Sequence, residues 1–176
     1  MTAADTHRPS FAVFRRGAGT ELDGIMRFEP LSAVATEGLA AMTAAGMDHG
    51  HETRVLFALP GMSLVRLWFK SGFPLVRHTH DVDCLYYVLA GSLALGDETL
   101  SAGDGFFVGA ETPYAYTAGP AGVEVLEFRA SADFNIRLLA DNPAYWTRAA
   151  ESVGAHSPGW MSEARPSAAP ATAEPA

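Results

Sequence analysis

Short apolar segments separated by turn signals fill the middle of the chain, from about residue 53 to residue 130. The segments are rich in aromatic and branched side chains, and no helical pattern lies between them. This favours an all-β antiparallel sandwich or barrel over a parallel sheet. We expect turns at 60–61, 71–72, 96–97, 103–104 and 119–120, and strands over 53–59, 63–70, 74–77, 84–89, 92–95, 98–101, 105–109, 113–117 and 123–130.

Two helices are expected to flank these strands. Ser32 can cap a helix over about 33–45, with Gly46 as its stop, and Asn142 followed by Pro143 can begin a second helix that runs to about residue 153. At the ends, we expect a mobile N-terminal arm over 1–20 and a disordered tail rich in alanine and proline over 161–176. The part between, 21–160, is expected to be a single domain with its barrel core at about 53–130.

Charge and composition restrict the partners. The 176 residues are 48% hydrophobic and carry a net charge of −8, which argues against nucleic acid or an anionic membrane as partner. No apolar run approaches the roughly 18 residues of a membrane span, and no signal peptide is recognised. We therefore expect a cytoplasmic protein without a nucleic-acid or membrane partner. The single cysteine, Cys84, excludes an internal disulfide.

His78 and His80 are the first candidate metal ligands. They follow a predicted strand and are separated by one residue, so their side chains should share a face, where two imidazole nitrogens can meet one metal ion. A single inward histidine is usually an ordinary core residue. Two at this spacing favour metal binding.

The surrounding residues resemble the first motif of the cupin superfamily. Gly72, His78, His80 and Gly91 fit the spacing of that motif, and Cys84 occupies the position where the family usually has glutamate. In the second motif only Gly103 matches, and Tyr114 takes the place of the usual third histidine. The resemblance implies a cupin double-stranded β-helix, or jelly-roll barrel, with short N- and C-terminal helices. It also implies a homodimer.

The third ligand is left open among Cys84, Asp83, Tyr114 and none. A Cys84 thiolate would suit zinc or copper, but a cysteine here also packs well as a small apolar residue. Similarity to thiol dioxygenases implies another role, a thioether between this cysteine and Tyr86, Tyr114 or Tyr116. Asp81 and Asp83 have a sufficient local role as turn residues.

Other polar residues complete the list of candidates. Tyr86, Tyr114 and Tyr116 are candidate catalytic residues that would donate hydrogen bonds or protons. Arg66, Glu127 and Arg129 lie on strands, where an inward arginine would bind a substrate carboxylate and an outward one would form a surface ion pair. His49 and His51 are interpreted as part of a surface turn.

The leading hypothesis is a metal-dependent enzyme that acts on a small molecule. The resemblance favours an oxygenase with iron on His78 and His80, while zinc, copper, nickel and manganese stay open as alternatives. Two other functions are compatible with the same residues. One is a zinc-type lyase, isomerase or cyclase, and the other is a non-catalytic cupin that binds or senses a small ligand.

Overall fold

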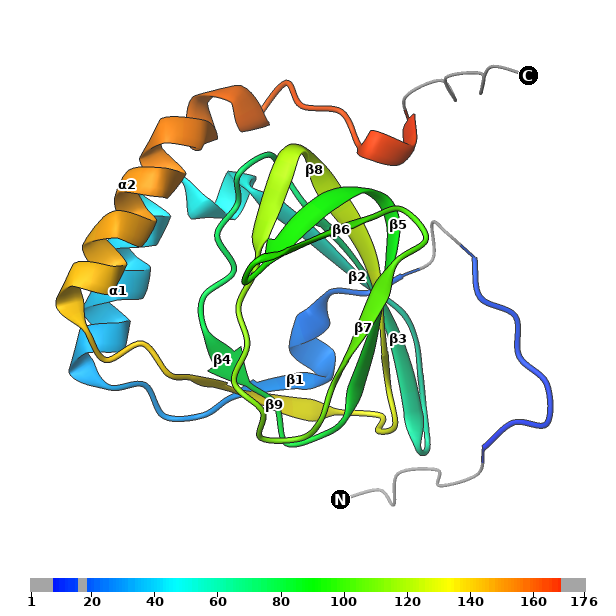
Figure 1. Cartoon of the computed structure of the whole chain (residues 1–176). Helices are drawn as coiled ribbons and strands as arrows, with labels where there is room; N and C mark the ends of the chain where they lie inside the picture. Colours follow the sequence, from blue (N-terminus) through cyan, green and yellow to red (C-terminus); the bar gives the residue numbers. More distant parts are fainter. Residues whose placement is uncertain (1–7, 16–18, 169–176) are drawn as a thin grey trace, which may run out of the picture.

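The strands of the computed structural model form two sheets around one interior, and two helices pack against one side of this barrel (Figure 1). The structure describes residues 8–15 and 19–168. In chain order its elements are η1 (Leu22–Gly24), β1 (Met26–Phe28), α1 (Ala33–Ala44), η2 (Met47–His49), β2 (His51–Leu59), β3 (Met62–Phe69), β4 (His78–Thr79), β5 (Cys84–Leu95), β6 (Glu98–Ser101), β7 (Gly105–Val108), β8 (Thr117–Arg129), β9 (Phe134–Leu138), α2 (Pro143–Trp160) and η3 (Pro166–Ala168).

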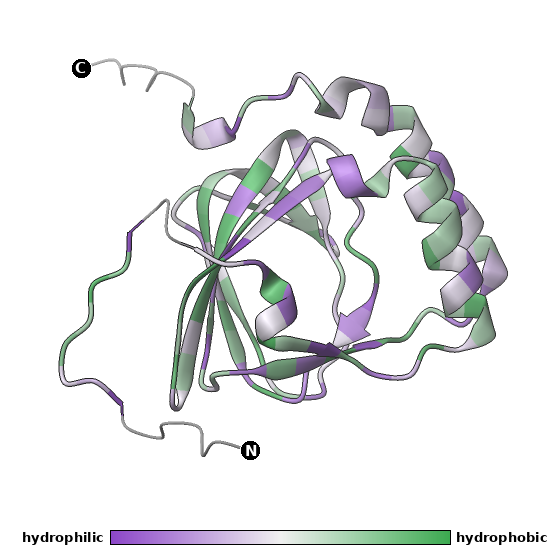
Figure 2. Ribbon diagram, turned by 180° about the vertical axis from the view of Figure 1, so that it is seen from behind, coloured by the Kyte–Doolittle hydropathy of each residue, from purple (hydrophilic) through white to green (hydrophobic). Residues whose placement is uncertain are grey.

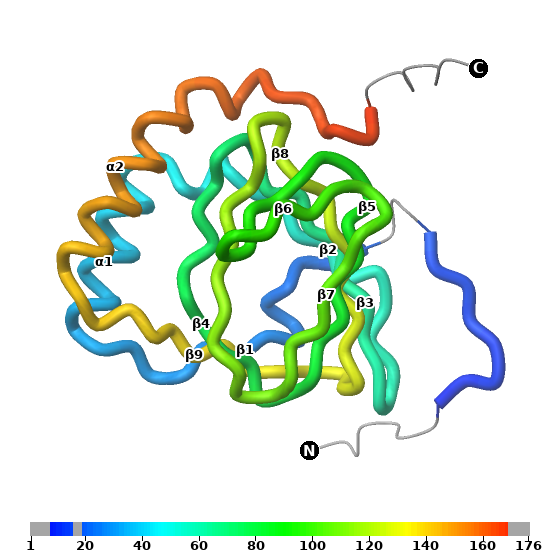
Figure 3. Tube along the Cα trace, in the orientation of Figure 1, coloured from blue at the N-terminus to red at the C-terminus, as the bar shows by residue number. Residues whose placement is uncertain are grey.

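The strand order is that of a mainly antiparallel barrel. The larger sheet has the order β2-β3-β8-β5-β6, and β7 pairs with the first part of β5. The smaller sheet has the order β1-β9-β4, in which β1 and β9 run parallel. The trace in Figure 3 shows the two sheets enclosing the interior. The prediction of an all-β jelly roll with flanking helices is confirmed.

Several predicted strand limits are wrong. Residues 84–95 form one continuous strand rather than two, and β8 runs through the turn expected at 119–120. Pairing explains the second case, because Gly91 lies opposite Val123 while Leu93 lies opposite Ala118, so that residues 119–122 bulge from the strand. The strand expected over 74–77 begins only at His78, and the one expected over 113–117 makes only isolated bridges.

The two helices lie side by side along the barrel (Figure 1). The Ser32 hydroxyl accepts a hydrogen bond from the Ala35 amide, and the Asn142 side chain accepts one from the Ala144 amide, so both predicted caps are confirmed. Helix α2 continues to Trp160 instead of ending near residue 153. In the part of the chain that the structure describes, no helix is both long and apolar enough to span a membrane.

Burial along the strands alternates, as a barrel with one solvent face requires. Tyr86 and Val88 on β5 are fully buried, while their neighbours Leu85 and Tyr87 are exposed. Figure 2 shows hydrophobic and hydrophilic residues interleaved along the strands. The core therefore lies inside the barrel and between the barrel and the helices.

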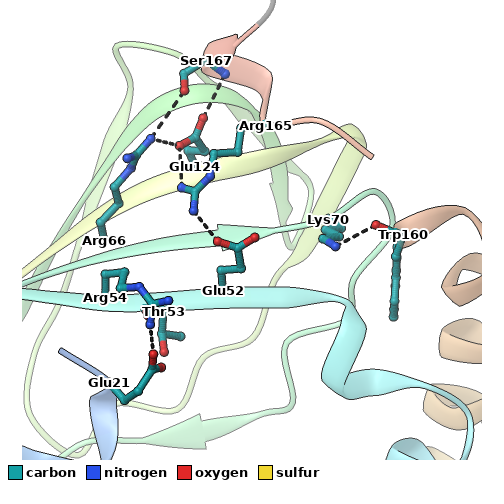
Figure 4. Close-up of polar contacts among 10 residues, drawn as sticks. All are labelled: Glu21, Glu52, Thr53, Arg54, Arg66, Lys70, Glu124, Trp160, Arg165 and Ser167. Atoms are coloured by element: carbon teal, nitrogen blue, oxygen red, sulfur yellow. Dashed lines mark hydrogen bonds and ion pairs between the residues drawn. The ribbon is translucent and has the colours of Figure 1, made fainter. Parts of the chain in front are cut away.

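The segment 161–168 lies on the outer face of the larger sheet (Figure 4). Glu163 accepts hydrogen bonds from the Ser71 amide and hydroxyl. Arg165 pairs with Glu52 and Glu124, and the Ser167 amide donates to Glu124. The disorder expected for 161–176 is thus not seen in 161–168, and residues 169–176 lie outside the described residues.

The N-terminal arm is described only in part, because residues 1–7 and 16–18 lie outside the described residues. The ring centroids of Phe14 and Phe57 are 5.4 Å apart, and Thr20 forms an isolated antiparallel β-bridge with Val55. The mobility expected of residues 1–20 stays a prediction.

Candidate active site

His78 and His80 lie together inside the barrel. Their side chains are buried, and their ring centroids are 4.8 Å apart. His78 belongs to β4, which pairs with β9, and its backbone also exchanges hydrogen bonds with Tyr114. The prediction that the two imidazoles share a face is confirmed.

Backbone carbonyls fix the tautomer of both rings. His78 Nδ1 lies 2.6 Å from the carbonyl oxygen of Val76, and His80 Nδ1 lies 2.6 Å from that of Asn135. A carbonyl oxygen can only accept, so each Nδ1 carries a proton and each Nε2 keeps a lone pair. Hydrogen bonding of this kind behind an imidazole is common in metal-ligating histidines.

Both imidazoles are neutral near neutral pH. Burial lowers the pKa of His78 to about 4, and the positive charge of Arg129 contributes. Burial also lowers the pKa of His80 to about 3, with further contributions from Arg129 and His78. Desolvation disfavours the charged imidazolium in each case, so the Nε2 lone pairs are not taken by protons.

Two of the candidate tyrosines join the histidine pair. Tyr114 Oη lies 2.8 Å from His78 Nε2 and donates to it, and Tyr86 Oη is hydrogen-bonded to Tyr114 Oη. Burial, followed by the charge of Glu127, raises the pKa of both phenols. They are therefore neutral donors. Tyr116 packs against Phe69 and Phe106, and its hydroxyl makes no hydrogen bond with any described residue.

Cys84 lies at the start of β5, with Arg129 of β8 and Val108 of β7 as its register partners. Its side chain is buried, and burial raises the pKa of its thiol to about 12, with Glu127 adding to the effect. Among the described residues, no three His, Cys, Asp or Glu side chains are arranged to hold a metal ion. The role of Cys84 as a metal ligand beside His78 and His80 stays a prediction.

The two turn aspartates have structural partners instead. Asp81 accepts a hydrogen bond from the Asn135 amide, and Asp83 accepts one from the Ala110 amide. Both contacts join the turn before β5 to neighbouring segments. The local role expected for these aspartates agrees with the structure.

Glu127 and Arg129 point into the barrel. Arg129 Nη2 lies 2.5 Å from Glu127 Oε2, and 5% of Glu127 and 2% of Arg129 are exposed. Burial raises the pKa of Glu127, and the guanidinium of Arg129 opposes that rise. Arg66 lies on the opposite face of the sheet, where it pairs with Glu124 (Figure 4).

A cavity of about 190 Å³ adjoins His78, His80, Glu127 and Arg129. His51, at the start of β2, also lines it, so the prediction of a surface turn is wrong for this residue. Its strand begins earlier than predicted because η2 and Gly50 turn the chain back toward the barrel. The remaining lining is mostly apolar: Leu22, Met26, Phe28, Leu39, Met47, Thr53, Leu67, Phe69, Phe73, Pro74, Leu75, Val76, Phe134, Ile136 and Leu138.

The chain forms a two-sheet antiparallel barrel with a His-x-His pair on its inner surface, as the predicted cupin jelly roll requires. No family model matches the sequence, and no curated protein matches it. Solved structures do resemble it, and they include a protein described as an RmlC-like cupin, from Shewanella frigidimarina NCIMB 400. That likeness has 23% identity and a TM-score of 0.42, over 47% of this chain and 77% of the other.

Two further similar structures extend this comparison. KdgF from a Halomonas species is 25% identical with a TM-score of 0.41, over 46% of this chain and 81% of the other. The polyketide cyclase RemF from Streptomyces resistomycificus is 21% identical with a TM-score of 0.48, over 59% of this chain and 84% of the other.

Proposed function

We propose that this chain is an enzyme that acts on a small, largely apolar molecule in the cavity, with a divalent metal ion held by His78 and His80. The observation that supports the proposal is the orientation of the two imidazoles. Each ring is fixed through Nδ1, so that Nε2 of both rings keeps its lone pair, and both histidines line an apolar cavity.

The donor set suits an open metal site. Two neutral imidazoles are good ligands for iron, zinc, copper and nickel, and the remaining positions would stay free for substrate and water. A metal ion bound there would supply Lewis-acid or oxygen-activating chemistry. We propose iron and an oxygenase reaction first, with zinc and a lyase, isomerase or cyclase reaction as the alternative.

The protein's own groups have separate tasks. Tyr114 donates to His78 Nε2 in the structure, so this hydroxyl has to release the nitrogen before the nitrogen can bind a metal ion. Once released, the neutral phenol can donate its proton to a bound molecule, and Tyr86 can replace that proton through their shared hydrogen bond. The apolar walls keep water away from the reacting groups.

Metal binding by matched variants tests the proposal. The full chain, stripped with a chelator, would be incubated without oxygen with Fe²⁺ or Zn²⁺, desalted and analysed for metal. We expect about one ion per chain, loss of that ion in His78→Ala and His80→Ala, and full retention in His49→Ala, because His49 is exposed outside the cavity. Equal metal content in all four proteins would refute the site. Oxygen consumption by the iron-loaded protein during a substrate screen would separate the oxygenase from the alternatives.

A non-catalytic module for binding a small ligand is the second candidate. It is favoured by the absence of a third His, Cys, Asp or Glu ligand among the described residues and by the Tyr114 hydroxyl at His78. This function predicts that metal-free protein binds its ligand and that His78→Ala leaves the affinity unchanged.

A further inference from the structure

The guanidinium of Arg129 has unused hydrogen-bond donors beside the cavity. Its Nη2 donates to Glu127, and one face of the group lies 3.7 Å from the centre of the Phe134 ring. Its Nε and Nη1 are buried and have no hydrogen-bond partner among the described residues. Arg129 itself lines the cavity.

Such donors require an acceptor. A buried donor without a partner loses its hydration and gains nothing in return, so buried polar groups in proteins are nearly always satisfied by protein, water or ligand. Ser63 lies opposite Arg129 in the β3–β8 register, and its buried hydroxyl also has no partner in the described structure. This end of the barrel interior thus holds several buried polar atoms without a partner among the described residues.

The other residues that line the cavity restrict the kind of ligand that can supply this acceptor. Leu67, Phe69, Val76, Ile136 and Leu138 give it an apolar wall. The ligand should therefore be a small molecule with one polar end and an aromatic or aliphatic body.

The charge of the site indicates one negative charge on that ligand. Arg129 is positive, and the single negative charge of Glu127 beside it balances that charge. A single carboxylate can accept from Nη1 and adds only one negative charge beside this pair. A dianion such as a phosphate ester would meet the Glu127 carboxylate and an apolar wall, and the described residues that line the cavity include no second Lys or Arg.

The polar end would lie near the histidine pair. The Phe134 ring contacts both groups, since its centroid is 5.1 Å from that of His80 and it stacks against Arg129. A carboxylate at Arg129 would thus hold the adjacent part of the ligand close to His80.

We infer that Arg129 anchors the carboxylate of a small apolar monocarboxylic acid in this cavity. The inference rests on the proposed function, because it names the class of molecule on which the proposed enzyme would act. Binding of the acid itself requires no metal. This makes the two proposals separable by experiment.

The test compares acids with their neutral amides, using benzoate against benzamide and hexanoate against hexanamide. Binding to the metal-stripped full chain would be measured by titration calorimetry at about pH 7.5, where the acids are ionised. We expect each acid to bind roughly 10- to 100-fold more tightly than its amide. Because this measurement contains no metal, its result is independent of the metal-binding test of His78→Ala. Equal affinity for acid and amide, or no binding of either acid, would overturn the inference.

Two variants assign the preference to Arg129. The double variant Glu127→Gln/Arg129→Met removes both charges together and leaves neither unpaired, and it should lose the preference for acids. Glu127→Gln alone keeps an acceptor for Arg129 Nη2 while removing the neighbouring negative charge, so it should bind the acids more tightly than the wild type. Unfolding curves would show that each variant is folded. If the double variant does not fold, weaker or unchanged acid binding by Glu127→Gln contradicts the inference.

Discussion

At the scale of single residues, the pair formed by Glu127 and Arg129 was the feature least accessible from sequence. The histidine pair could be predicted because its spacing and its resemblance to a known motif are local properties. Strand alternation places Glu127 and Arg129 on one face, but it does not say whether that face is the inner one. Leu126 and Phe128 on the other face are as apolar as Val123 and Val125, so only the three-dimensional structure decides.

Removal of the Glu127 carboxylate should strongly destabilise the protein. Glu127→Ala leaves the buried Arg129 without its counter-charge, for which we expect a loss of about 3–5 kcal/mol in the free energy of unfolding. Glu111→Ala breaks a pair of similar geometry with Arg137, but both partners are about half exposed, so its cost should stay below about 1 kcal/mol. Urea unfolding measures both values. Equal costs would show that the inward pair contributes no more than a surface one.

At the scale of elements, local signals predicted helices better than strands. Ser32 and Asn142 begin their helices through hydrogen bonds to residues two or three positions away, so the sequence alone indicates them. Strands β1 and β9 escaped prediction because they are short and their pairing depends on a partner more than 100 residues away. The third metal ligand stayed undecided for a similar reason, since it depends on how distant segments meet.

The contact between α1 and α2 predicts opposite effects for one type of substitution. A Cβ at Gly38 would lie 2.0 Å from the ring of Trp146, whereas a Cβ at Gly154 meets no atom within 4 Å. Gly154→Ala should stabilise the protein by about 0.5–1 kcal/mol through helix propensity. Gly38→Ala should destabilise it by about 1–3 kcal/mol because the helices must move apart. Thermal and urea unfolding of both variants measure this difference, and stabilisation by Gly38→Ala would contradict the packing.

The segment 161–168 makes the stability of the larger sheet depend on pH through Glu124. Burial raises the pKa of Glu124, but hydrogen bonds from Ser167 and the charge of Arg66 outweigh it, so that the pKa is lowered. A carboxyl group with a lowered pKa in the folded state contributes its full stability above its ordinary value of about 4.5. That contribution is lost as the pH falls through the pKa of the folded state.

Glu124→Gln should therefore cost more at neutral than at acid pH. We expect a loss of about 1–3 kcal/mol near neutral pH, which shrinks toward zero at pH values below the folded-state pKa, where wild-type Glu124 is itself protonated. Urea unfolding at a series of pH values gives the comparison. If the loss in the free energy of unfolding does not change with pH, the charge of Glu124 does not contribute to stability.

At the scale of the whole molecule, the outer face of the larger sheet carries an apolar patch formed by Leu85, Tyr87, Phe107 and Phe128. All four side chains are exposed, Phe107 by 65%, and Leu85 lies in register with both phenylalanines. Contiguous exposed apolar side chains of this kind mark interaction surfaces. The homodimer expected from the cupin resemblance stays a prediction, and this patch is the face on which we expect the second copy.

The oligomeric state of two charge variants tests this interface. Phe107→Glu should shift the chain from dimer to monomer in light scattering or sedimentation, because it places a carboxylate in the centre of the patch. Met161→Glu alters a similarly exposed apolar residue at the end of α2, outside the strands that carry the patch, and should leave the dimer intact. A wild-type monomer, or a dimer in Phe107→Glu, would rule out this face.

The hydrogen bonds that join Tyr86, Tyr114 and His78 give the protein an intrinsic spectroscopic probe. Anything that takes the lone pair of this imidazole has to displace the phenol that now occupies it. The displaced phenol then changes its hydrogen bonding deep inside the protein, where ultraviolet absorption is sensitive to such changes. Occupancy of the histidines could thus be followed by difference spectroscopy, without a label and before any substrate is known.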